Sequence, residues 1–439
     1  MKKAYLKILS SLVFLSLIIS SLFFCVSCTA GSDTVISADE LLANAAAEDN
    51  YKLDYVWNYL DEWRFPAFSA GKLKRVENLY KKYYYKEIPT SYEIALEVAD
   101  IFVSESYNEI ELTDSDKVTD AIITAYVAAI GDPYSYYRTA DEYQNYTGNM
   151  SGTFVGIGIT VVYTEETGVA EISGTVKDSP AEKAGILAGD VLVAVDGKML
   201  SDIGYETAVD CIRGEKGTKV EITVLRRGEE ITFSVTRAPI VDLSVDYYIT
   251  EEKIGYIDID SFKLNTDELF IEAIDYMKEN GARVIVYDVR NNGGGYLETV
   301  VNMLDYIASD KMTLASFSNN YDDPYVADDG HSLSIPSVVL CNEMSASASE
   351  LFTSGIRDIG AIDGFEVAIV GKKTYGKGIM QNTYLFSDES SITMTVAYYN
   401  PPSGINYHGV GITPDVIVED GEGDPQLDAA YLEIAKLIK

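Results

Sequence analysis

The feature that most constrains this chain is an alternation of strand-like and helix-like segments in its C-terminal half. The strand-like runs are "KIGYIDIDSF", "ARVIVYDVR", "SIPSVVLCN" and "EVAIVG", and between them lie "TDELFIEAIDYMKENG", "YLETVVNMLDYIAS" and "ASELFTSGIRDIG". Because parallel strands need crossover connections, this rhythm predicts an α/β fold with a largely parallel, buried sheet. Catalytic groups of such sheets gather beyond the carboxyl ends of the strands, so the loops there are the candidates for chemistry.

The residue pattern of the 439-residue chain changes from apolar to helical to β-branched segments, which predicts a mixed multidomain protein. Residues 1–28 form an export signal, residues 29–108 a helical N-terminal region, and residues 109–150 the helical start of the C-terminal domain. In the last of these, the apolar spacing from Asp116 predicts a helix that Gly131 and Pro133 end. Residues 151–240 carry short β-branched runs split by turns, which predicts a compact inserted domain of five strands and two helices. Residues 241–439 hold the β-α segments.

The amino terminus has the charge and hydropathy pattern of an export signal. Three lysines within the first seven residues precede the apolar run "ILSSLVFLSLIISSLFF". Ser27 before Cys28 resembles the cleavage point of bacterial lipoproteins, although Cys25 stands where an aliphatic residue is usual. We therefore expect an extracytoplasmic protein of the cell envelope, tethered to the membrane through a lipid on Cys28, with a plain anchor or a secreted form as the alternatives.

Composition excludes several classes of partner. With 34 Lys and Arg against 69 Asp and Glu the formal charge is −35, so the surface field repels nucleic acid. Beyond the signal only Cys211 and Cys341 remain, which predicts buried free thiols and neither a metal site nor another cofactor. The aromatic-rich text from Leu41 to Tyr107 is typical of a packed core or a subunit contact, so a homodimer through the N-terminal helical region is the candidate assembly.

The stretch "NEMSASASELFTSG" places three serines at alternate positions, Ser345, Ser347 and Ser349, where a buried strand gives way to a helix. Ser347 and Glu350 match the S-x-x-E capping box, so Ser347 could simply cap the helix. A serine at a helix amino terminus also lies in a positive field beside free N–H groups, which suits a nucleophile whose product is an oxyanion. The local sequence favours neither role over the other.

Two further loops follow strands of the predicted sheet. "NNGGG", residues 291–295, exposes backbone N–H groups, as a flexible turn or a phosphate site also would. "GKKTYGKGIMQ", residues 371–381, holds Lys377 between two glycines, and the spacing of four to Gln381 predicts both side chains on one face of a strand.

A base is also needed for a serine nucleophile. The two histidines, His331 and His408, lie in polar loop text and leave few ways to build a serine-histidine-aspartate triad. Lysine can replace histidine where desolvation lowers its pKa from about 10.4. Lys377, which leads into an apolar strand, is the candidate for such an amine.

Together these loops and the domain before them resemble the carboxyl-terminal processing peptidases, also called tail-specific proteases. The similarity covers roughly Asp116 to Asp415 and rests on ordered motifs: "DPYSYY", "GTFVGIGI", "DSPAEKAGILAGDVLVAVDG", "IRGEKGTKV", "IGYIDIDSF", "DVRNNGGG", "SASASE", "GKKTYGKGIMQ" and "GVGITPDVIV". The resemblance implies a crotonase- or Clp-protease-like catalytic core with an inserted PDZ-like domain. Two departures are the extra piece "AIDGFE" and Gly293, where many relatives carry proline.

The resemblance also implies the roles of single residues. The nucleophile falls on Ser347, the general base on Lys377 and the supporting glutamine on Gln381. Ser345 and Ser349 are then small neighbours that let a substrate backbone approach.

The family's oxyanion hole uses backbone N–H groups from the glycine loop and from the residue after the nucleophile. These map to Gly294, or in its place Gly293 or Gly295, and to Ala348.

The PDZ-like domain implies a second site. In such modules a "GIG"-type loop receives a peptide carboxylate on its N–H groups while the peptide adds as a strand. The residues concerned are Gly156, Ile157, Gly158 and Ile159. Arg213, in "IRG", either couples an occupied peptide site to the catalytic loops or pairs with a nearby carboxylate, and we favour the pairing.

The sequence thus predicts an extracytoplasmic serine endopeptidase that grips the exposed apolar carboxyl terminus of a protein substrate and cuts upstream of it with a serine-lysine dyad. The alternative is a catalytically inactive, peptide-binding scaffold lipoprotein, against which the joint presence of Ser347, Lys377 and Gln381 speaks. Phosphate binding at "NNGGG" ranks last, because the lysine-and-hydroxyl text of a phosphate loop is missing.

Overall fold

The computed structural model describes residues 35–36, 68–88, 114–165, 167–241, 243–318 and 322–437. The predicted signal, Cys28 and most of the predicted region 29–108 lie outside these residues. The chain divides into two compact units, one of residues 1–144, 316–324 and 378–400 and one of residues 145–315, 325–377 and 401–439. Residues 241–439, taken as one segment in the sequence, therefore contribute to both units. None of the helices in the described part of the chain has the length and apolarity that a membrane span requires.

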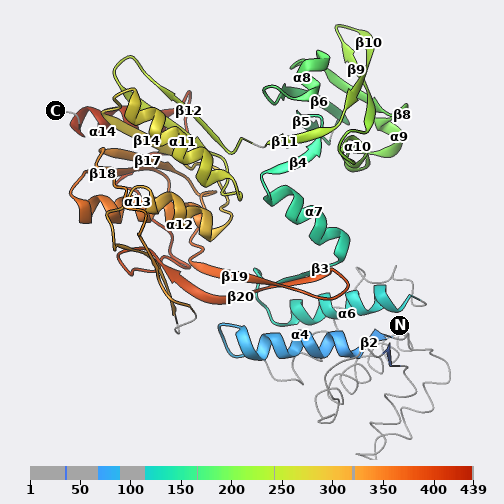
Figure 1. The fold of residues 1–439 in the computed structure, drawn as a ribbon, viewed down its shortest axis with the longest axis horizontal. Coiled ribbons are helices and arrows are strands. Elements are labelled where there is room, and N and C mark those ends of the chain that lie inside the picture. Colours follow the sequence, from blue (N-terminus) through green and yellow to red (C-terminus); the bar gives the residue numbers. More distant parts are fainter. Residues whose placement is uncertain are drawn as a thin grey trace, which may run out of the picture. The chain divides into compact units, whose positions relative to one another are not determined.

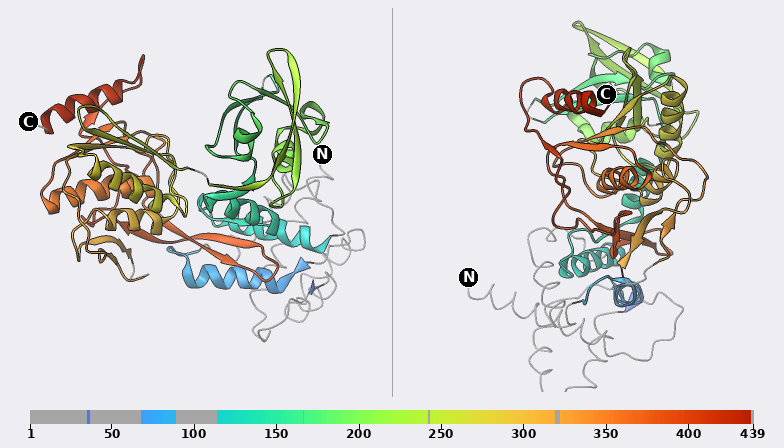
Figure 2. Two further views of the ribbon diagram at one scale, coloured as in Figure 1. Left: turned by 45° about the horizontal axis from the view of Figure 1, so that its top comes forward. Right: turned by 90° about the vertical axis from the view of Figure 1, so that its left-hand side faces the viewer.

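The first unit packs helices on a long β-hairpin. Its described elements are β1 (Val35–Ile36), β2 (Phe68–Ser69), α4 (Ala70–Tyr83), α6 (Ser115–Ala129), β3 (Tyr136–Arg138), the start of α7 (Ala140–Met150), β19 (Ile379–Leu385) and β20 (Ser391–Asn400). Strand β20 pairs antiparallel with β19 and with β3, and the end of β15 (Thr313–Phe317) pairs with its last residues. Figure 2 shows the hairpin, in orange, running along α4 and α6.

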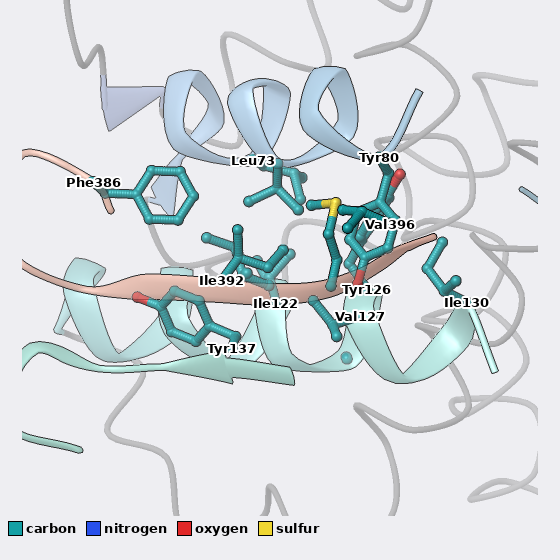
Figure 3. Packing of buried hydrophobic residues seen from close by; sticks show 14 of the residues in the cluster. Leu73, Tyr80, Ile122, Tyr126, Val127, Ile130, Tyr137, Phe386, Ile392 and Val396 are labelled. Atoms are coloured by element: carbon teal, nitrogen blue, oxygen red, sulfur yellow. The ribbon is translucent and has the colours of Figure 1, made fainter. Parts of the chain in front are cut away.

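Apolar side chains from both helices meet on β20 and make the core of this unit. Tyr80 of α4 and Tyr126 of α6 are fully buried, and Ile392 and Val396 of β20 lie between the helices (Figure 3). Helix α6 begins at a capping aspartate and ends before Gly131, where the sequence predicts its end. Strand β3 was not predicted, because its only pairing is with residues about 255 positions away, beyond the reach of local pattern.

The second unit contains the β-rich inserted domain. A sheet of β10 (Glu229–Thr236), β9 (Lys219–Arg226), β7 (Val191–Val195), β6 (Val169–Thr175) and β5 (Ile159–Thr164) holds the five predicted strands, and α8 (Pro180–Ala184) and α10 (Tyr205–Ile212) are the two predicted helices. The sequence did not predict the short elements β4 (Thr153–Gly156), β8 (Lys198–Met199), α9 (Leu200–Ile203) and β11 (Ala238–Val241). Strand β5 is the last in the sheet order, so one of its edges has no neighbouring strand there.

The same unit contains the β-α part of the chain. Its sheet runs in the order β12 (Val245–Ile249), β13 (Ile254–Ile259), β14 (Val284–Asp288), β17 (Ser337–Cys341), β18 (Val367–Gly371) and β21 (Val416–Ile417). Within this sheet the neighbours β13, β14, β17, β18 and β21 are parallel, and β12 is antiparallel to β13. This confirms the largely parallel sheet and the α/β class. Every residue of β14 and β17 is buried.

Helices cover both faces of this sheet (Figure 1). One face packs on α11 (Thr266–Glu279), α12 (Leu297–Asp305) and α13 (Ala348–Asp363), where Phe270, Tyr287 and Phe352 make tilted and edge contacts. The other face packs on α14 (Pro425–Leu437) through Ala430 and Ile434. Between α12 and β17, β15 pairs with the short β16 (Tyr325–Val326). With both faces covered, the open places along the sheet are the loops at its strand ends.

Candidate active site

Three loops at the carboxyl ends of the adjacent strands β14, β17 and β18 carry the candidate residues. Ser345 and Ser349, on either side of Ser347, hold the first two loops together. The hydroxyl of Ser345 donates to the Val289 carbonyl and that of Ser349 to the Asn292 carbonyl, both at 2.7 Å. Both serines are 0 % exposed, so their hydroxyl groups fasten the neighbouring loop and are not open to solvent. That their small size lets a substrate backbone approach stays a prediction. Ser347 is only half-buried and is the serine of the three that solvent reaches.

The backbone of Ser347 has a rare conformation. Its φ is 59° and its ψ −116°, at the amino terminus of α13, and it forms the expected capping box with Glu350. A positive φ in a residue with a Cβ costs about 1–3 kcal/mol and persists only where its surroundings enforce it. Tyr407 supports this turn, because its hydroxyl donates to the Ser347 carbonyl at 3.4 Å.

Glu350 joins the serine loop to the lysine loop. One oxygen of its carboxylate accepts from the backbone N–H groups of Ser347, at 2.9 Å, and Lys377, at 2.7 Å. The other accepts from the Thr374 hydroxyl at 2.5 Å and the Gly376 N–H at 2.7 Å. Glu350 is 0 % exposed, and four donors replace the water that an ionised carboxylate loses on burial. Its carboxylate therefore sets the distance between the loops of Ser347 and Lys377.

Gly294 lies against the serine turn. A Cβ on Gly294 would come within 2.8 Å of the Ala346 carbonyl oxygen, 2.9 Å of the Ser347 Cβ and 3.1 Å of the Ala348 nitrogen, so only glycine fits. Its φ of 107° has the same requirement. The structure thus brings Gly294 and Ala348, the two predicted oxyanion donors, to the same place beside Ser347.

The neighbouring glycines behave differently. Gly295 packs against the Phe262 carbonyl, and a Cβ on Gly293 would meet no atom within 4 Å.

The side chain of Asn292 accepts a hydrogen bond from the Gly294 N–H, one of the two predicted oxyanion donors. The N–H of Gly294 donates to the Asn292 side-chain oxygen at 2.9 Å, and the Asn292 amide donates to the Ile259 carbonyl at 2.7 Å. Asn292 is 0 % exposed. The N–H of Ala348 belongs to the first turn of α13, where amides lack intrahelical acceptors.

Lys377 and Gln381 do not share a strand. Lys377 is half-buried in the loop after β18, whereas β19 begins only at Ile379. The prediction that a spacing of four places both on one strand face is therefore wrong. The Gln381 amide donates to the Ile379 carbonyl at 3.3 Å and to the Thr395 hydroxyl at 3.4 Å.

A loop after β20 covers the lysine loop. The N–H of Gly409 donates to the Gly376 carbonyl at 2.8 Å, so His408 stands next in sequence to a residue that touches the candidate site. The other histidine, His331, pairs with Asp329 at 3.0 Å. His408 is thereby the histidine to weigh against Lys377 as a base.

The "GIG" loop of the inserted domain is fixed by its carbonyl groups. The Ile157 carbonyl accepts from the Ala181 N–H at 2.8 Å, and the Gly158 carbonyl accepts from the Val176 N–H at 3.0 Å. Gly158 has φ 79°, and a Cβ there would lie 2.4 Å from the Ser179 Cβ. Ile159, half-buried, opens β5, whose edge is the free edge of that sheet. The loop and this edge are thus adjoining parts of the chain, as peptide addition requires.

Arg213 ends helix α10, with its guanidinium over the Phe154 ring at 5.9 Å. The buried Arg237 donates to the carbonyl groups of Cys211 and Ile212 at the end of the same helix, at 2.6 and 2.9 Å. Neither contact assigns Arg213 a role beyond this helix end.

Titration and metal binding add two observations. Burial raises the pKa of the Cys341 thiol to about 12, so Cys341 is not a nucleophile at neutral pH. Among the described residues, no group of three or more His, Cys, Asp and Glu side chains is placed to hold a metal ion.

Nothing in the sequence indicated that Glu350 links two loops or that Asn292 holds Gly294. The capping box was a visible signal for Glu350, but its other donors lie 24 to 27 positions later in the chain. For Asn292, no sequence signal distinguished its role from that of the neighbouring Asn291.

Comparisons with known proteins place these loops in a family. Residues 253–418 match the model of peptidase family S41, and residues 171–226 match that of a PDZ domain. The chain is 35 % identical over 308 residues to a CtpA-like serine protease of Staphylococcus haemolyticus, with 69 % of this chain and 60 % of the relative covered. It is 34 % identical over 310 residues to one of Staphylococcus aureus, with 70 % and 61 % covered. The chain thus spans about three fifths of the length of the curated relatives it matches.

One solved structure gives the same picture of the fold. An S41 protease from Bacteroides fragilis superposes with a TM-score of 0.51 at 15 % identity, over 83 % of this chain and 97 % of that one. A photosystem II D1 C-terminal processing protease matches at 25 % identity and a TM-score of 0.46, over 82 % and 97 %.

Proposed function

Because the chain belongs to peptidase family S41 and carries a PDZ domain, we propose that it is a serine endopeptidase that processes proteins from their carboxyl termini. The observation that carries the proposal is the shared carboxylate oxygen of Glu350. It accepts from the backbone amides of Ser347 and Lys377, so two loops separated in sequence present a serine and a lysine at one place. Gly294 packs against the same serine.

In the proposed reaction Ser347 attacks the scissile carbonyl and Lys377, neutral before the step, takes the hydroxyl proton. The C–O bond that forms leaves a tetrahedral oxyanion, which accepts from the N–H groups of Ala348 and Gly294. Collapse breaks the C–N bond, and the lysine returns its proton to the leaving amine. Water then releases the acyl group by the same sequence of steps.

Two groups support this chemistry in the proposal. Gln381 is the residue to which the family resemblance gives the role of supporting the lysine. The oxyanion competes with the Asn292 side chain for the Gly294 N–H, and an anion is the stronger acceptor of the two.

Substrate recognition is proposed for the inserted domain. Its "GIG" loop would take a terminal carboxylate on N–H groups, and the free edge of β5 would pair with the last residues of the substrate. We expect apolar terminal residues, because Ile159 and Val161 face the packed side of β5. Coupling of this site to catalysis through Arg213 stays a hypothesis. An Arg213→Ala variant that binds peptide and turns over normally would reject it.

The cellular setting is also a proposal. The amino-terminal sequence favours export, lipidation at Cys28 and a place on the outer side of a membrane. Mass spectrometry of the mature amino terminus tests the lipid directly. A homodimer through the N-terminal helical region is tested by sedimentation of the full chain.

The central experiment compares the full-length protein with its Ser347→Ala and Lys377→Ala variants on an unfolded substrate that ends in apolar residues. Both variants should lose at least about 1,000-fold in kcat/KM, as removal of a nucleophile or base does. Lys373 is an exposed lysine of the same loop, so Lys373→Ala is the matched control and should retain activity. Cleavage by Ser347→Ala at the original rate would reject the serine, and equal cleavage of an amidated substrate would reject carboxylate recognition.

His408→Ala separates the two candidate bases. If Lys377 is the base, this variant keeps its pH profile, whereas loss of activity confined to His408→Ala would move the role to the histidine. An inactive peptide-binding scaffold, the rival function, predicts peptide binding without cleavage by the unmodified protein.

A further inference from the structure

A line of buried polar groups leads from the "DPYS" motif to Gln381. The hydroxyl of Ser135 donates to the Asp132 carboxylate at 2.6 Å and accepts from the Thr395 N–H at 3.3 Å. The Thr395 hydroxyl in turn accepts from the Gln381 amide at 3.4 Å. Thr395 is 0 % exposed, and Asp132 and Ser135 are less than a tenth exposed. All four residues lie in the first compact unit.

Both backbone polar groups of Thr395 have hydrogen-bond partners outside β19. Strand β3 pairs with β20 only as far as Thr393, and beyond that point the N–H of Thr395 goes to Ser135 while its carbonyl accepts from the Tyr85 N–H at 3.3 Å. These contacts satisfy backbone groups that would otherwise be buried without partners. The backbone of Thr395, from which the hydroxyl projects, is therefore held by the motif and by the segment after α4.

Gln381 needs such a partner because it lies at an irregularity of the hairpin. The register of β19 and β20 shifts between Met380 and Gln381, whose partners are Ala397 and Thr395. A bulge of this kind re-aims side chains and weakens the local ladder. An amide next to a bulge, with two long hydrogen bonds, would otherwise choose among several rotamers.

We propose that Thr395, held by Ser135 and Asp132, is a positioning residue that fixes the amide of Gln381. The inference rests on the proposed peptidase function and adds a role for a motif that the catalytic loops leave unexplained. Thr395 does not touch the reacting atoms, and it acts only through Gln381.

The hairpin provides a matched control for this idea. Thr383 and Thr393 form the neighbouring cross-strand pair on the same face, with their hydroxyl groups 2.8 Å apart. Thr393 is 4 % exposed and also accepts from Arg138 at 3.2 Å. Thr393→Val and Thr395→Val each replace a buried hydroxyl by a methyl group of the same shape, so a purely structural role predicts similar effects for both.

Steady-state kinetics of the full-length variants test the proposal. Thr395→Val should lower kcat about 10-fold with KM changed less than about 2-fold, the loss expected when a group that orients a base becomes mobile. Thr393→Val should keep kcat within about 2-fold, and Thr395→Ser should restore most of it. Thermal unfolding of both valine variants confirms that each folds and shows what each costs in stability. Equal kcat values for the two valine variants would overturn the proposal.

A double variant tests whether the effect passes through Gln381. If it does, Gln381→Ala with Thr395→Val is no slower than Gln381→Ala alone, because the mobile group is already gone. Losses that multiply instead would reject the proposal. The Ser347→Ala comparison keeps the two questions apart: an inactive Ser347→Ala with a fully active Thr395→Val refutes the positioning role and leaves the peptidase intact.

Discussion

Replacing Glu350 by glutamine tests whether one buried carboxylate holds the two catalytic loops together. The change keeps the shape of the side chain but turns one acceptor oxygen into an NH₂ group. Each oxygen now serves two donors, Ser347 and Lys377 on one and Thr374 and Gly376 on the other. Whichever way the glutamine amide turns, its NH₂ group faces one of these two pairs of donors, and that pair loses its acceptor.

The expected loss follows from these four bonds. The least costly arrangement points the NH₂ at the Thr374 hydroxyl, which can rotate, and leaves the Gly376 N–H buried without an acceptor, at about 1–3 kcal/mol. The remaining bonds lose their charge assistance, and relief of carboxylate burial offsets part of that loss. We expect a net destabilisation of about 2–3 kcal/mol, or roughly 5–10 °C in Tm for a unit of this size. A shift of about 1 Å between the loops would lower kcat about 100-fold.

Thermal unfolding and kcat of the full-length variant measure both effects. Glu343→Gln is the matched control, because Glu343 is exposed in the same loop and pairs with Lys372 at 3.2 Å. This surface change should stay within about 0.5 kcal/mol of the unmodified protein and keep its activity. A Glu350→Gln protein that unfolds and cleaves like the Glu343→Gln control would show that the carboxylate does not set the loop geometry.

Three further changes follow from the local geometry. Gly294→Ala should abolish cleavage, because its Cβ collides with the serine turn, whereas Gly293→Ala has open space and should be tolerated in the same assay. Gly158→Ala, at φ 79° and against Ser179, should weaken binding of a free-carboxylate peptide by at least about 10-fold in fluorescence anisotropy and leave the amidated peptide, already a poor ligand, unchanged. Burial, with neighbouring carboxylates, raises the pKa of Asp258 to about 6, so the folded state holds this proton more tightly than the unfolded state and loses stability as pH rises from about 4 to 6. Asp258→Asn should therefore stabilise the protein above pH 6 by about 1–2 kcal/mol, after allowance for partial solvent screening, and not below pH 4; equal gains at both pH values in urea unfolding would contradict this assignment.

The sheet could be predicted from the sequence because its signal is local. Each strand of the β-α part is a short apolar run, and each helix has its own period, so the order of elements and the parallel pairing follow without long-range information. The helix at Ser115–Ala129 was equally legible from its spacing and its terminating Gly131. The loops that carry the candidate residues were found by the same logic, from the ends of strands.

Relations between loops could not be predicted in this way. The alternate serines Ser345 and Ser349 look equivalent to Ser347 in sequence, but their hydroxyl groups are consumed by carbonyls of the neighbouring loop. The spacing between Lys377 and Gln381 suggested a strand that in fact starts two residues after the lysine. In the second case a periodicity argument was applied to a lysine that lies in a loop, where side-chain direction is set by tertiary contacts.

The ambiguity between cap and nucleophile at Ser347 can be resolved by backbone strain. An ordinary serine cap in the same unit, Ser179, has φ −70° and accepts from the Glu182 N–H, which is the usual extended geometry of such residues. Ser347 instead has φ 59°, a conformation that capping does not need and that glycine adopts without a Cβ penalty.

Ser347→Gly should therefore keep or raise Tm, because relief of about 1–3 kcal/mol of strain exceeds the few tenths of a kcal/mol that a helix cap loses on changing to glycine. The same change should abolish cleavage. Ser179→Gly, with no strain to relieve, should lower Tm in the same unfolding assay. A Ser347→Gly protein destabilised as much as Ser179→Gly would mean that Ser347 serves the helix as an ordinary cap and that its conformation holds no strain for a nucleophile to use.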